Sequence, residues 1–181
     1  MKISFLTLIF LFAFSFSVFA QTATERDKGM ELYNQGEYEK AVEALQNSIK
    51  TDEKDRIAWT YLGASFVKLK KDDDALEAFR KMDGVFGKNI PVYDKNLKIK
   101  SRPRVEYNDT ARNNSTVGTV KIAVEFGADG QIGFAFPFQT LPDGLTEIGI
   151  KAAKSIKFEP AVQNGKPVTV VRMIEYKFDI H

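Results

Sequence analysis

The sequence contains no cysteine, and its single histidine is the last residue, His181. Without cysteine the chain has no disulfide, no thiol nucleophile and no thiolate metal ligand. One histidine leaves neither a Ser-His-Asp relay nor a His-rich metal cage. Asp129 lies in a predicted turn and Glu159 in a motif that ends a helix, and we expect both carboxylates to be solvated. We therefore expect a protein that is not an enzyme and that has no cofactor and no metal.

A strong charge of one sign is also missing. The 26 Lys and Arg residues are balanced by 24 Asp and Glu residues, which gives a net charge of +2. A nucleic-acid surface normally shows as a concentrated excess of Lys and Arg. Nucleic acid is therefore not an expected partner.

Charge is absent altogether from residues 3–20, which read ISFLTLIFLFAFSFSVFA and follow Lys2. A positive residue, an apolar run and the small-x-small ending Val18-Phe19-Ala20 predict a signal peptide over residues 1–20. The alternative is an uncleaved anchor, although 18 helical residues span only about 27 Å of a hydrocarbon core of about 30 Å. Both interpretations export the rest of the chain, so we expect a periplasmic protein. A membrane would be a partner only if the leader is retained.

Proline is missing between residues 22 and 88, where apolar residues recur at helical spacing. All six prolines lie from Pro91 onward, together with alternating β-branched runs. This change predicts two domains of different class. We expect helical repeats over 22–88, a linker over 89–109 and an α+β domain over 110–181.

The helical region repeats itself with a period of 34 residues, because Gly29 aligns with Gly63, Ala41 with Ala75, and Leu45 with Phe79. With Trp59-x-x-Leu62-Gly63, this pattern resembles the tetratricopeptide (TPR) repeat, with Lys70 in place of the turn glycine. The resemblance implies TPR-like helical hairpins whose inner face binds peptide. The residues at those positions are Met30, Tyr33, Asn34, Thr60, Ala64, Val67 and Lys68. The alternative is that these side chains are only packed or solvated.

The second region predicts the order β-β-α-β, with a three-stranded antiparallel sheet against one helix. Residues 119–126 alternate apolar and polar side chains, and Gly127 to Gly130 form a turn toward a second strand over 131–138. In that second strand Ile132, Phe134, Phe136 and Phe138 are expected to face inward. A helix over 146–157, capped by Asp143 or Thr146, covers the sheet. Residues 168–180 form the final strand.

These residues resemble the C-terminal domain of the energy transducer TonB over residues 98–181. The most specific match is Ile156-Lys157-Phe158-Glu159-Pro160-Ala161 followed by Asn164-Gly165-Lys166-Pro167-Val168. Gly118-x-Val120 and Asp129-Gly130 also match. Asn108 stands where the family usually has proline, and Ile156 where it has tryptophan.

The resemblance implies that the last strand binds an extended peptide, the N-terminal box of an outer-membrane TonB-dependent transporter. An edge strand carries unpaired N–H and C=O groups that accept another strand, which is binding by β-augmentation. The same groups also allow pairing with a second copy of the chain. The residues expected at this edge are Val168, Thr169, Val170, Val171, Arg172, Met173, Ile174, Glu175 and Tyr176.

The sequence thus favours a periplasmic adaptor that binds a protein or peptide partner in TonB-dependent transmembrane transport. One alternative is a membrane-anchored energy transducer. Transducers of the TonB family, however, use an anchor that bears a histidine and a long Pro-rich spacer, and neither is visible in this sequence. The other alternative is a structural scaffold of the cell envelope that only dimerises.

Overall fold

The structure, a computed structural model, describes residues 25–85 and 93–179. The chain divides into two compact units, Met1–Asn89 and Ile90–His181. The expected leader over residues 1–20 lies outside the described residues. Among the residues that are described, no helix has the length and apolar character needed to cross a bilayer.

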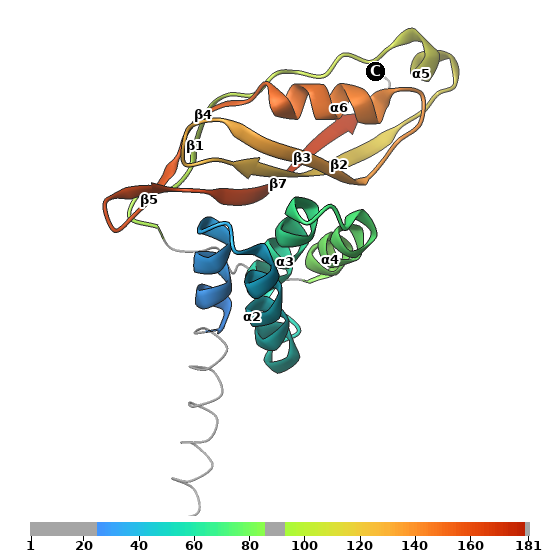
Figure 1. The fold of residues 1–181 in the computed structure, drawn as a ribbon. Coiled ribbons are helices and arrows are strands. Elements are labelled where there is room, and N and C mark those ends of the chain that lie inside the picture. The colour runs from blue at the N-terminus through green and yellow to red at the C-terminus, as the bar shows by residue number, and fades with distance from the viewer. Residues whose placement is uncertain (1–24, 86–92, 180–181) are drawn as a thin grey trace, which may run out of the picture. The chain divides into compact units, whose positions relative to one another are not determined.

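The N-terminal unit is entirely helical in its described part. A helix over residues 25–34 precedes α2 (Tyr38–Thr51), α3 (Arg56–Lys68) and α4 (Asp72–Gly84), each joined to the next by a short turn (Figure 1). Gly36 and Lys70 lie in two of these turns with positive φ values of 82° and 58°. These residues are 34 positions apart, so the same turn conformation recurs with the period found in the sequence.

The same close approach between helices recurs with that period. A Cβ atom on Gly29 would lie 2.5 Å from Cγ of Leu45, and one on Gly63 would lie 2.8 Å from Cε1 of Phe79. Leu45 and Phe79 are both fully buried. Glycine is therefore needed at both positions, since any side chain would displace a core residue of the facing helix.

The C-terminal unit is an α+β domain with more strands than the sequence predicts. The elements are β1 (Lys98–Ser101), α5 (Asp109–Asn113), β2 (Gly118–Phe126), β3 (Ile132–Gln139), α6 (Leu145–Lys154), β4 (Lys157–Glu159), β5 (Ala161–Gln163), β6 (Lys166–Val168) and β7 (Val170–Phe178). The main sheet is antiparallel with the order β3-β2-β7, while β1 pairs with β4 and β5 pairs with β6.

Helix α6 covers one face of the main sheet (Figure 1). Gly149 is the point of closest approach, because a Cβ atom there would lie 3.3 Å from Val120 and 3.4 Å from Ile122. The core between helix and sheet is formed by apolar residues of β2, β7, α6 and their flanking segments, chiefly Val120, Ile122, Val124, Phe126, Leu145, Ala153, Ile156, Val170, Ile174, Tyr176 and Phe178. The inward direction predicted for the apolar residues of 119–126 is therefore confirmed, whereas the other face, expected to be polar and exposed, is also buried at Ala123 and Glu125.

Strand β3 does not keep the single alternation that its sequence suggests. Ile132 and Ala135 pack against the core beneath α6, whereas Phe136 lies opposite Ala123, on the other face of the sheet. The register shifts between Val124 and Phe126 and again next to Lys121. A shift of one residue reverses the faces, so the expectation that Phe136 faces inward together with Ile132 is wrong.

Three further segments differ from expectation. Helix α6 ends at Lys154, and residues 157–159 form β4 instead of continuing the helix. Its partner β1 lies inside the expected linker over 89–109, so part of that segment belongs to the sheet unit. Neither Asp143 nor Thr146 caps α6, whose N-cap is Gly144 with φ of 78°.

Candidate functional site

The candidate site is the outer edge of β7. Strand β7 ends the sheet order β3-β2-β7, and its residues pair with β2 in continuous register from Phe178 opposite Gly118 to Val170 opposite Phe126. Within residues 25–85 and 93–179, β2 is the single strand that pairs with β7. The other side of β7 is therefore a strand edge.

One hydrogen bond identifies which backbone groups face outward. In an antiparallel strand the N–H and C=O of one residue point to the same side, and successive residues alternate. The carbonyl of Thr119 accepts a hydrogen bond of 2.7 Å from Nε2 of Gln139 on the β3 side, so Gly118, Val120 and the other even-numbered residues of β2 point toward β7. Their register partners in β7 point back toward β2. The outward N–H and C=O groups therefore belong to Val171, Met173, Glu175 and Lys177.

Arg102 reaches this edge from the segment that follows β1. Its guanidinium donates a hydrogen bond to the carbonyl oxygen of Glu175, as the outward direction of that carbonyl requires. The guanidinium carbon also lies 4.5 Å from the centroid of the Tyr176 ring, within cation–π distance. In the described part of the chain the outward backbone groups make no bond to another backbone segment. Within the described residues, the hydrogen bond from Arg102 is therefore the one made to an outward backbone group of β7.

Tyr176 lies beneath Arg102 and belongs to the core. Its side chain faces α6, where Cδ2 would be 3.6 Å from a Cβ atom on Gly149. Its hydroxyl is buried with no hydrogen-bond partner among the described residues. Burial raises the pKa of Tyr176 above its ordinary value, and the nearby Arg102 guanidinium, whose N–H donors and charge both favour the phenolate, acts in the opposite direction.

The structure places the nine expected edge residues in three settings. Val168 lies in β6 opposite Ala161, and Thr169 lies between the strands, where its hydroxyl accepts a hydrogen bond from the backbone N–H of Ala128. Residues 170–176 lie in β7. Val170, Ile174 and Tyr176 face the core, and Arg172 shares their face opposite Val124, 6.0 Å from the ring of Tyr93. The edge therefore begins two residues later than the expected site.

The expected inner face of the helical unit is partly core. Tyr33 is 3% exposed, and its ring packs edge-on against Tyr38 and Tyr61 at centroid distances of 5.5 and 5.4 Å. Ala64 is fully buried, whereas Asn34 is exposed. Intermediate exposure is shared by Met30, Thr60, Val67 and Lys68. For Tyr33 and Ala64, burial agrees with the packing interpretation.

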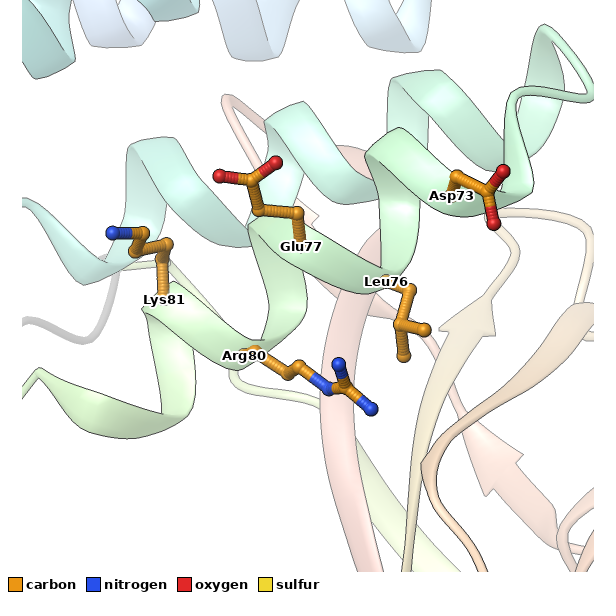
Figure 2. A pocket seen from close by; sticks show the side chains of 5 residues that line it. All are labelled: Asp73, Leu76, Glu77, Arg80 and Lys81. Carbon is orange, nitrogen blue, oxygen red and sulfur yellow. The ribbon is translucent and has the colours of Figure 1, made fainter.

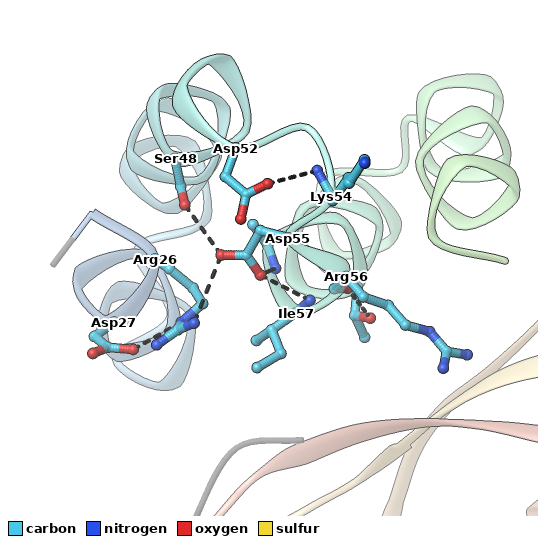
Figure 3. A network of polar contacts seen from close by, with 10 residues as sticks. Arg26, Asp27, Ser48, Asp52, Lys54, Asp55, Arg56 and Ile57 are labelled. Atoms are coloured by element: carbon cyan, nitrogen blue, oxygen red, sulfur yellow. Dashed lines mark hydrogen bonds and ion pairs between the residues drawn. The ribbon is translucent and has the colours of Figure 1, made fainter. Parts of the chain in front are cut away.

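A buried carboxylate in the helical unit has a structural role (Figure 3). Asp55 is 3% exposed and caps α3 by accepting hydrogen bonds of 3.0 Å from the N–H groups of Ile57 and Ala58. Ser48 donates to its other oxygen at 3.4 Å, and Arg26 pairs with that oxygen at 3.8 Å. These partners lie on three different helical segments, so Asp55 joins them.

The outer side of α4 carries an open pocket of about 440 Å³ (Figure 2). Leu76 is its apolar lining residue, and the four charged residues that line it are Asp73, Glu77, Arg80 and Lys81. The opposite side of α4 buries Ala75, Ala78, Phe79 and Met82 against the unit.

No protein-family model and no curated protein sequence matches the chain. Among solved structures, the solution NMR structure of the TonB C-terminal domain of Pseudomonas aeruginosa is 24% identical over 48% of this chain and 89% of that chain, with a TM-score of 0.40. The described residues themselves establish an α+β protein with a helical N-terminal unit and a three-stranded antiparallel sheet.

The role of Arg102 at this edge is not predictable from the sequence. The hydrogen bond joins residues 73 positions apart, and a contact of that separation leaves no local pattern. Arg102 lies in a run of basic residues before Pro103 that resembles an ordinary solvated segment. The alternation of residues 168–178 predicted a strand, and the resemblance to the TonB C-terminal domain implied that this last strand is the binding edge.

Proposed function

We propose that this protein is a non-enzymatic adaptor of the cell envelope that binds an extended peptide as an additional strand along β7. The observation that carries the proposal is the outward row of backbone groups on Val171, Met173, Glu175 and Lys177. Such a row accepts a peptide by main-chain hydrogen bonds, and the alternating side chains beside it give specificity.

Backbone pairing at this edge supports reversible binding. Net hydrogen bonds contribute about 1 kcal/mol each, so a peptide that uses most of the outward groups gains on the order of 5 kcal/mol before ordering costs reduce it. That value corresponds to a Kd on the order of 100 μM or weaker. Side-chain contacts must supply any further affinity.

The N-terminal box of an outer-membrane TonB-dependent transporter is our proposed peptide. The support is the resemblance of residues 98–181 to the TonB C-terminal domain, above all the motif around Pro160 and the turn Asn164-Gly165. Together with the expected signal peptide, this resemblance supports a periplasmic location. The 34-residue helical repeat supports a TPR-like unit that docks a second envelope protein through its inner face.

Peptide titration tests the edge directly. The full-length protein, labelled with ¹⁵N, is titrated with peptides from the N-terminal segments of outer-membrane transporters of the same genome. We expect the amide signals of Val171, Met173, Glu175 and Lys177 to shift most. The variant Met173→Pro lacks an outward N–H that makes no bond to β2, and edge strands tolerate proline. It should bind peptide at least about tenfold more weakly, which corresponds to about 1.4 kcal/mol.

Met173→Ala is the matched control, because it removes the same side chain and keeps the N–H. It should bind within about twofold of the natural protein. Equal peptide affinity of a folded Met173→Pro variant would contradict edge pairing. If none of the peptides shifts these amides while the protein sediments as a dimer, the scaffold interpretation is favoured instead.

A further inference from the structure

The outer edge of β7 is not open along its whole length. The Glu175 carbonyl, one of the outward acceptors, is already bonded to Arg102. A strand that pairs with β7 in full register must therefore displace this guanidinium. The N–H of Glu175 and the outward groups on either side of it are available without that displacement.

Arg102 is held in place by the fold around it. It follows β1 directly, and β1 is paired with β4, with Ile99 opposite Phe158 and Ser101 opposite Lys157. The guanidinium bonds the Glu175 carbonyl and also lies over the Tyr176 ring, 4.5 Å from its centroid. Its side chain makes no ion pair with a carboxylate in the described residues, so its full charge acts at this edge.

We propose that Arg102 caps the β7 edge and selects against pairing with a second copy of this chain. A symmetric dimer formed through β7 uses the same patch on both copies, so it must displace two guanidinium groups. A single peptide strand displaces one. Arg102 therefore penalises self-pairing twice and peptide binding once.

The charge of the edge acts in the same direction. Arg172 lies on the same face of β7 as Tyr176, the residue beneath Arg102. A symmetric pair of β7 strands would bring two guanidinium groups from each copy to one shared face. Like charges placed opposite each other across strands are destabilising, whereas a neutral or acidic peptide avoids this repulsion.

The effect can be measured on Arg102→Met, which keeps an unbranched, flexible side chain at this position but has neither the donor nor the charge. If each cap weakens pairing about tenfold, removing it lowers the dimer Kd about a hundredfold and the peptide Kd about tenfold. Arg104→Met is the matched control, because Arg104 is exposed two residues away. Sedimentation velocity of the full-length protein gives the first value, and titration with the transporter peptides gives the second.

The peptide arm rests on the proposed function, and the self-association arm does not. If Arg102→Met self-associates more strongly, and if this gain disappears in the double variant with Met173→Pro, the proposed cap is supported. This holds even if no peptide binds. In that case only the proposed function fails. The proposal is overturned if Arg102→Met self-associates no more than Arg104→Met, or if its dimer survives Met173→Pro. Weaker peptide binding by Arg102→Met also overturns it, since Arg102 would then contact the peptide. Arg102→Ala repeats the measurement if methionine disturbs Tyr176.

Discussion

At the scale of single residues, Lys70 carries a backbone cost that Gly36 avoids. Both have positive φ, at 58° and 82°, in equivalent turns of the helical unit. A side chain in this conformation costs about 1 kcal/mol, which glycine does not pay. We expect Lys70→Gly to raise the free energy of unfolding by about 0.5–1 kcal/mol in urea titrations followed by helical circular dichroism.

The same substitution inside a helix should have the opposite sign. Lys50 lies in the last turn of α2, where glycine costs up to about 1 kcal/mol. Lys50→Gly should therefore lower stability while Lys70→Gly raises it. A stability loss in Lys70→Gly would show that its side-chain contacts outweigh the strain of the turn.

Residues whose conformation is decided locally were predictable. Gly130 has φ of 80° in the expected hairpin turn, and Asn164 and Gly165 both have positive φ between β5 and β6. Asp143 was predicted to cap a helix, and its actual role could not be predicted from the sequence. Its carboxylate accepts hydrogen bonds from Asn114 and Thr116, 29 and 27 residues away, and such long-range partners leave no trace in a short window of sequence.

At the scale of elements, Glu159 ties β4 to β1. Lys100 Nζ lies 2.6 Å from one carboxylate oxygen, and Lys95 Nζ lies 3.6 Å from the other. The hydrogen bond from Lys100 is the main cause that lowers the pKa of Glu159 below its ordinary value. A lowered pKa contributes stability that is present above the unfolded pKa of about 4.3 and is lost as the pH falls through the folded pKa.

We therefore expect Glu159→Gln to be less stable than the natural protein at pH 7 and to approach it as the pH falls toward about 3. Urea unfolding at a series of pH values measures this difference. Lys100→Met should give the same profile, because it removes the other half of the main pair. A difference for Glu159→Gln that stays constant down to about pH 3 would mean that the pair adds no stability.

Elements were predictable where burial is regular. In strand β2 the apolar residues Val120, Ile122, Val124 and Phe126 all contact the core as their spacing predicts, although Ala123 and Glu125 on the other face are buried too. The predicted direction of Phe136 in strand β3 was wrong, because the register shifts depend on the partner strand β2. Strand β1 was missed because its four residues are all exposed and carry no apolar alternation; only its pairing with β4 makes it a strand.

At the scale of the whole molecule, the α+β class and the three-stranded antiparallel sheet follow from two hydrophobic periods in one chain. The helices of the first unit and the strands of the second each bury one apolar face, and the two units have separate cores. The place of β7 at the border follows from its antiparallel pairing with β2, which is already paired with β3. The sequence does not predict which residue contacts the edge of a sheet, as the position of Arg102 on β7 shows.

If residues 1–20 are a leader, as proposed, its cleavage decides how far from the inner membrane this edge can act. Thirteen residues separate the end of α4 at Gly84 from the start of β1 at Lys98, and they extend to about 45 Å at most. A retained anchor would keep the sheet unit close to the membrane that holds it. An adaptor for outer-membrane peptides is better served by cleavage, so we expect the exported protein to begin at Gln21.

N-terminal sequencing of fractionated cells measures this. The soluble periplasmic fraction should contain a chain that starts at Gln21, and Ala20→Asp, which removes the small residue before the cleavage point, should remain in the membrane fraction. An intact Met1 on the natural protein in the membrane fraction would instead favour the anchored transducer. In that case β7 would be presented from the inner membrane, and the partner peptide would have to come to it.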